Sequence, residues 1–106
     1  MRVKRFEAKK NREKVVVVLE NWYQVKEGWK FGVYHQLNLD LLPSGVIFGT
    51  KQGEYYSETG SDVYQRSIAV VNGRLFEYSH WKKGYVPCDD DALIRKMVRK
   101  GLEALS

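Results

Sequence analysis

Two histidines and a pair of adjacent lysines are the side chains best suited to acid–base chemistry in this chain. His35 and His80 could act as the general base and general acid of a metal-free ribonuclease, with Lys82 or Lys83 holding the phosphate. Such a reaction needs both imidazoles on one wall of a cleft, and nothing in the sequence indicates that they meet. We therefore predict one hydrogen-bonded core histidine, one surface histidine, and a protein that is not an enzyme.

The stretch from Cys88 to Asp91 combines a thiol with three consecutive carboxylates. A following helix N-terminus would lower the pKa of the thiol, but the neighbouring aspartates disfavour a thiolate, so we predict a packed, unreactive Cys88. Asp89–Asp91 could bind a divalent cation together with Glu54 or Glu58. Three contiguous aspartates before a helix are better explained by helix capping, and no phosphate-binding loop or nucleophile elbow occurs. We expect neither a metal nor a cofactor.

The positive charge of the chain is distributed in blocks. The formal net charge is +5, and residues 2–14, 63–86 and 92–106 each carry more basic than acidic side chains. A basic excess of this kind suits a polyanionic partner such as nucleic acid. The leading hypothesis is therefore a small, non-catalytic nucleic-acid-binding protein.

The expected nucleic-acid-binding residues are cations that would hold phosphates and aromatic rings on which bases would stack. They lie in an N-terminal basic arm, on or near predicted strands, and on the polar side of a C-terminal helix. They are Arg2, Lys4, Arg5, Lys9, Lys10, Arg12, Lys30, Tyr34, Arg74, Tyr78, Trp81, Lys82, Lys83, Tyr85, Arg95, Lys96, Arg99 and Lys100. The pattern does not distinguish DNA from RNA, or single from double strands.

A protein-binding inhibitor or adaptor is the alternative hypothesis. Trp, Tyr and Arg are the usual hot-spot residues of protein interfaces, and a basic domain can dock an acidic protein surface. A homodimer formed through an edge strand is a further possibility. Because Cys88 is the only cysteine and the longest apolar run is Val15–Leu19, we expect a cytoplasmic protein that does not interact with membranes.

The clearest strand pattern is residues 29–41, where apolar and polar residues alternate with one buried face. A weak strand at 2–9 is expected to pair with the β-branched stretch that begins at Val15, and a short strand at 46–51 with residues 29–41. We expect residues 52–62 to form a polar, acidic loop, with room for a short strand at 55–57.

Asn72-Gly73 gives the strongest local prediction, a type I′ turn between two apolar runs. The turn would place Val71 opposite Arg74, Ala69 opposite Phe76, and Tyr64 opposite Trp81. After Pro87, acidic residues and then a helical apolar stripe predict a helix at about 89–105.

These elements predict one α+β domain over residues 1–106. A β-rich body at 1–86 would form a curved antiparallel sheet of about five or six strands, and the single C-terminal helix would pack on one face. The predicted core residues are all apolar: Val15, Val17, Leu19, Phe31, Val33, Leu37, Leu39, Ile47, Ile68, Val70, Leu75, Met97, Val98 and Leu102.

Overall fold

Seven strands and one helix form the described part of the chain. The computed structural model describes residues 2–26, 29–57 and 60–106, and the side chains of residues 4–23, 31–54 and 63–106. The elements are β1 (Arg2–Asn11), β2 (Lys14–Lys26), β3 (Trp29–Leu41), β4 (Ile47–Ser57), β5 (Gly60–Val71), β6 (Arg74–Ser79), β7 (Gly84–Pro87) and α1 (Ala92–Leu105). Within these ranges no helix has the length and apolar character that crossing a bilayer requires.

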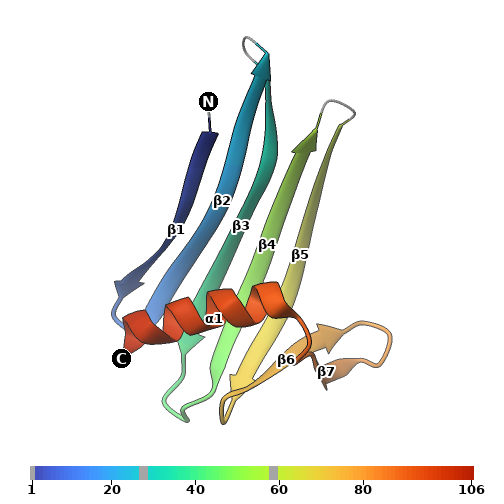
Figure 1. Ribbon diagram of the computed structural model, residues 1–106. Coiled ribbons are helices and arrows are strands. Elements are labelled where there is room, and N and C mark those ends of the chain that lie inside the picture. The colour runs from blue at the N-terminus through green and yellow to red at the C-terminus, as the bar shows by residue number, and fades with distance from the viewer. Residues whose placement is uncertain (1, 27–28, 58–59) are drawn as a thin grey trace.

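The strands form one antiparallel meander, because each pairs with its neighbour in chain order (Figure 1). The α+β prediction, with a single C-terminal helix on one face, is confirmed, but the sheet has seven strands rather than five or six. The loop predicted at 52–62 is wrong for residues 52–54 and 60–62, which are strand, whereas the short strand allowed at 55–57 is present as part of β4. Residues 58–59 lie outside the described residues. β4 continues to Ser57 and β5 begins at Gly60, with Gln52 opposite Gln65. Polar side chains are compatible with a strand when one face of an antiparallel sheet is solvated.

The turn at Asn72-Gly73 forms as predicted. Both residues have positive φ, 52° and 77°, and Val71 pairs with Arg74. The predicted pairing of Tyr64 with Trp81 is wrong, because β6 follows β5 only as far as Glu77 and then pairs with β7. Tyr64 instead pairs with Gly53 of β4. The departure of β6 leaves the far half of β5 paired on one side only.

The helix begins at Ala92, three residues later than predicted, because only the last aspartate caps it. The Asp91 carboxylate accepts a hydrogen bond from the Ile94 amide at 3.0 Å, the N-cap geometry. Asp89 instead accepts bonds from the Leu75 amide and the Arg74 guanidinium. This second anchor attaches the connection before α1 to β6.

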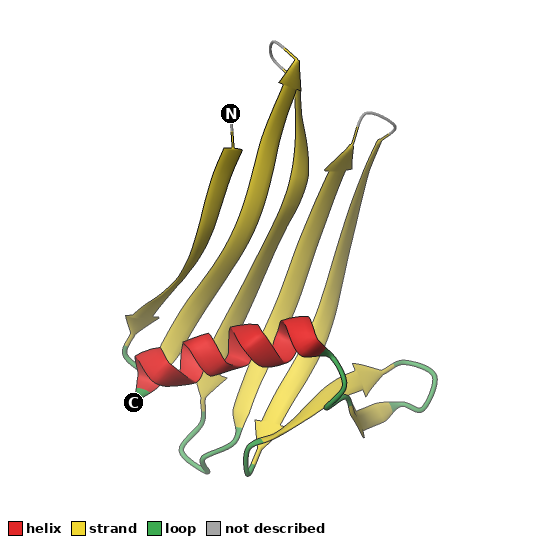
Figure 2. Ribbon diagram, in the orientation of Figure 1, coloured by secondary structure: helices red, strands yellow, loops and turns green. Residues whose placement is uncertain are grey.

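The helix covers only one end of the sheet (Figure 2). A helix is roughly 10–12 Å wide, whereas a strand of 13 residues, such as β3, spans about 43 Å. Ten predicted core residues are buried in the single hydrophobic cluster between α1 and the sheet: Val15, Val17, Leu37, Leu39, Ile47, Ile68, Val70, Leu75, Met97 and Val98. Four others are only partly buried: Leu19, Phe31, Val33 and Leu102. Strand alternation predicted the face of Phe31 and Val33 correctly, but it did not predict how much of that face the helix covers.

A glycine brings α1 close to the sheet. At Gly101 an added Cβ would lie 2.6 Å from Leu39 and within 3.3 Å of Val17 and Val15. The side of α1 that faces the sheet also carries Ile94 and Met97, which are buried. Because α1 lies across one end of the sheet, one flank of the helix borders the uncovered half (Figure 2).

Candidate functional site

A buried lysine lies where the covered half of the sheet meets the uncovered half. Lys51 of β4 pairs with Leu37 of β3 and Arg66 of β5, so its side chain lies on the face that packs against α1. Its exposed fraction is 0%. Lysine is almost never fully buried unless it is paired, so this residue needs a specific explanation.

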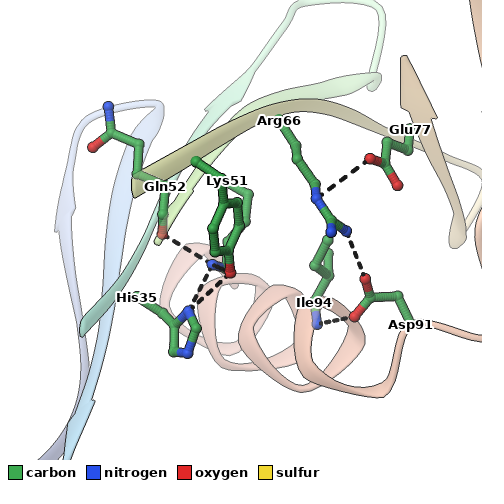
Figure 3. Close-up of polar contacts among 8 residues, drawn as sticks. His35, Lys51, Gln52, Arg66, Glu77, Asp91 and Ile94 are labelled. Atoms are coloured by element: carbon green, nitrogen blue, oxygen red, sulfur yellow. Dashed lines mark hydrogen bonds and ion pairs between the residues drawn. The ribbon is translucent and has the colours of Figure 1, made fainter. Parts of the chain in front are cut away.

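Three acceptors surround the Lys51 ammonium (Figure 3). Nζ lies 2.9 Å from His35 Nδ1, 3.0 Å from the Tyr64 hydroxyl and 2.9 Å from the Gln52 carbonyl oxygen. No described carboxylate forms an ion pair with it. Burial, and then the nearby Arg66 charge, lowers the Lys51 pKa to about 8, against a smaller opposing effect of Asp91.

His35 and Tyr64 are brought to Lys51 by strand register. His35 pairs with Gly53, and Gly53 pairs with Tyr64, so the three residues lie in one row across β3, β4 and β5. An added Cβ at Gly53 would collide with the Tyr64 ring, which therefore lies directly over this glycine. Burial, and then the Lys51 charge, lowers the pKa of His35 to about 4, so the imidazole is neutral at pH 7. Burial raises the Tyr64 pKa, so its hydroxyl stays protonated.

Arg66 connects this cluster to the start of the helix. Its guanidinium lies 3.5 Å from Glu77 and 3.3 Å from Asp91, the N-cap of α1 (Figure 3). It also lies over the Tyr64 ring, 5.3 Å from the centroid. Both carboxylates are therefore held by Arg66, and neither forms an ion pair with Lys51.

A second group of cations lies on the same face, between Phe6 of β1 and the C-terminal end of α1. Lys96 and Lys100 of α1 place Nζ over the Phe6 ring at 5.1 and 5.2 Å. Lys10 Nζ lies 3.5 Å from the Leu105 carbonyl oxygen, and Lys4 precedes Phe6 by two residues, so both extend to the same side of β1. We name Lys4, Lys10, Lys96 and Lys100 the Phe6 lysine cluster. In the described part of the chain, none of these four lysines forms an ion pair with a carboxylate.

Other predicted nucleic-acid-binding residues lie elsewhere or are neutralised. The cations of the N-terminal basic arm lie on strand β1 or in the turn after it, in agreement with the strand predicted at residues 2–9. Arg5 pairs with Glu7 and Glu20, and Arg74 pairs with Asp89. Lys9 extends to the opposite face from Phe6, and Arg12 lies in the β1–β2 turn.

The four predicted helix cations do not form one stripe. Lys96 and Lys100 cover Phe6, whereas Arg95 and Arg99 line a shallow groove with Gly73 on the other flank of α1. The flank that borders the uncovered half of the sheet is therefore the lysine flank.

Three of the four predicted aromatic residues, Tyr78, Trp81 and Tyr85, lie in the β6–β7 hairpin. Tyr78 and Tyr85 contact each other edge to face, and His80 contacts Tyr78. Trp81, Lys82 and Lys83 lie in the turn, where Trp81 is 92% exposed. Tyr34 donates to Gln36 on the face away from α1. The side chains of Arg2 and Lys30 lie outside the described residues.

The structure does not bring the two histidines together. His35 contacts Lys51 and Tyr64, whereas His80 lies beside Tyr78 at the hairpin. Cys88 is buried as predicted, and burial with nearby carboxylates raises its pKa to about 11. Sequence reasoning missed Lys51 and Tyr64. A signal exists in the alternation Ile47, Gly49, Lys51, Gly53, which places Lys51 on the same face as the buried Ile47.

No family model, curated protein or solved structure matches this chain. The function is therefore inferred from geometry and charge.

Proposed function

We propose that this protein is a small, non-catalytic nucleic-acid-binding protein that holds a single strand on the face carrying α1. The observation that carries the proposal is the Phe6 lysine cluster, four cations without a carboxylate partner in the described part of the chain. The strand would run beside the lysine flank of α1, over the half of the sheet that the helix leaves uncovered.

The pairing of the cations supports this placement. Arg5, Arg66 and Arg74 are each held by at least one carboxylate, so they stabilise the fold. The lysines of the cluster have no carboxylate partner in the described part of the chain, so phosphates would replace the water around their ammonium groups. A lysine ammonium is a compact charge on a flexible side chain. It suits contacts to the phosphates of a nucleic acid, which do not depend on the base sequence.

Aromatic rings on the uncovered half of the sheet favour single strands over duplexes. Tyr23 and Phe31 stack at 5.1 Å between centroids on β2 and β3, and both rings are partly exposed. Register and alternation place them on the same face as Phe6, at the end of the sheet away from α1. Bases stack on such rings only when they are unpaired.

The alternative proposal is a protein-binding inhibitor or adaptor that docks an acidic protein surface. The β6–β7 hairpin favours this reading, because Trp81 is 92% exposed and Lys82 and Lys83 follow it. Phe48 and Tyr85 are also exposed beside it and contact each other. Exposed aromatic residues beside cations are typical of protein interfaces.

Fluorescence anisotropy across a salt series tests the proposal with labelled single-stranded DNA, single-stranded RNA and duplex DNA. The wild type should bind single strands more tightly, and its affinity should fall steeply with salt. Replacing the four cluster lysines with Gln should reduce the log–log salt slope by about 3, since each phosphate contact on a single strand contributes roughly 0.7.

A matched control also removes four cations, from Lys9, Lys82, Lys83 and Arg95, which lie outside the cluster. This variant should keep most of the salt slope. Equal losses in the two variants would show that net charge matters rather than the cluster. Absence of binding by the wild type at low salt would refute the proposal and favour the protein partner.

A further inference from the structure

The protons around Lys51 can be assigned from geometry. An ammonium carries three donors and no acceptor, and three acceptors lie within 3.0 Å of Nζ. His35 Nδ1 must therefore offer its one lone pair to Lys51. A neutral imidazole that accepts at Nδ1 carries its proton on Nε2. His35 is thus fixed as an Nε2–H donor.

His35 Nε2 is directed away from Lys51 (Figure 3). It has no hydrogen-bond partner among the described residues. In those residues, every buried side-chain nitrogen or oxygen atom does have a hydrogen-bond partner. Nε2 is therefore not buried, and its N–H can donate to a ligand from solvent.

Tyr64 presents a second donor. Its hydroxyl oxygen accepts from Lys51, and the only described acceptor near it is His35 Nδ1 at 3.2 Å. The Nδ1 lone pair is already used by Lys51. The Tyr64 hydroxyl proton can therefore turn to an incoming acceptor.

We infer that His35 and Tyr64 form an anion-binding site, in which Nε2–H and the Tyr64 hydroxyl donate to phosphate oxygens and the Lys51 ammonium lies behind them. The nearest carboxylates, Glu77 and Asp91, are held by Arg66 and do not compete for the two donors. Both donors are neutral, but a hydrogen bond to an ionised phosphate oxygen is charge-assisted and stronger than one between two neutral groups. In its fuller form the inference rests on the proposed function, because the phosphate would belong to the bound single strand.

Nuclear magnetic resonance of the imidazole nitrogens in the full chain tests the site, with His80 as an internal control. In the free protein at pH 7, His35 should show the Nε2–H tautomer. Adding inorganic phosphate should shift the His35 signals saturably and leave those of His80 nearly unchanged. A protonated Nδ1 in the free protein, or no response to either phosphate or an oligonucleotide, would overturn the inference.

Two variants and a second probe separate this inference from the proposed function. Tyr64→Phe removes only the hydroxyl, and it should weaken phosphate binding at least tenfold while the His80 signals report an intact fold. Lys51→Met should do the same by removing the charge.

A single-stranded oligonucleotide that binds without shifting His35 would overturn the inference and leave the proposed function standing. A response to inorganic phosphate without any oligonucleotide binding would support the anion site and refute the proposed function.

Discussion

The covered and uncovered halves of the sheet share the same strands and the same face, yet their side chains differ in burial. Under α1, Val17 and Leu37 are fully buried. A few residues along the same strands, Leu19 and Val33 are only partly buried. The difference arises because a single helix is much narrower than these strands are long. A long sheet with one helix thus keeps part of its apolar face in contact with solvent.

The largest expected effect distinguishes these two halves directly. Leu37→Ala, in the covered half, should lower the free energy of unfolding by about 3 kcal/mol, because it opens a cavity beneath α1. Val33→Ala, in the uncovered half, should cost less than about 1 kcal/mol, because water already reaches the site. Urea denaturation followed by circular dichroism measures both. Similar losses would mean that the open half is as tightly packed as the covered half.

The direction of the side chains along each strand could be predicted from the sequence, but the extent of coverage by α1 could not. Alternation in residues 29–41 correctly placed Phe31, Val33, Leu37 and Leu39 on one face, since side-chain direction along a strand is local. Coverage by α1 is a tertiary property, so the partial exposure of Phe31 and Val33 did not follow from the pattern.

The candidate site was harder to predict than the fold. Lys51 is charged, and buried charges are rare, so alternation alone does not predict its burial. Its partners His35 and Tyr64 are far apart in sequence, and the register predicted from the Asn72-Gly73 turn pairs Tyr64 with Trp81 instead of Gly53. Only the full register of β3, β4 and β5 brings the three together.

Lys51 lies on the border of the two halves, and its burial should give stability a distinct pH dependence. Its pKa is about 8 in the folded chain and near 10.5 when unfolded. Between these values the unfolded chain binds more protons, so stability rises with pH. From pH 7 to 9.5 the gain should be about 2 kcal/mol.

Cys88 also has a shifted pKa, so it contributes to the pH dependence of stability at alkaline pH. That contribution is the same in the wild type and in Lys51→Met, so the difference between the two proteins isolates the effect of Lys51. Urea denaturation at several pH values should show the wild type gaining stability over the variant as pH rises. Parallel curves would mean that Lys51 keeps an ordinary pKa and is well solvated.

Asp91 should fix the covered half by holding the helix in place. Asp91→Ala removes the N-cap bond to Ile94 and the ion pair with Arg66, and should cost about 1 kcal/mol. Asp90→Ala is the matched control, because Asp90 is exposed and is not the capping residue. Thermal unfolding of the two variants measures the difference. An equal effect would show that the acidic run acts only through its summed charge on the helix dipole.

The smallest expected effect concerns the lysines that border the uncovered half. Lys96→Gln and Lys100→Gln should each change the unfolding free energy by only about 0.5 kcal/mol, because each loses one exposed cation–π contact with Phe6. The same substitutions should measurably weaken binding of single-stranded nucleic acid, while Arg95→Gln on the other flank should not. Urea denaturation and anisotropy on the same samples test the two effects together. A large loss of stability would mean that these lysines stabilise the fold, and would remove them from the proposed binding surface.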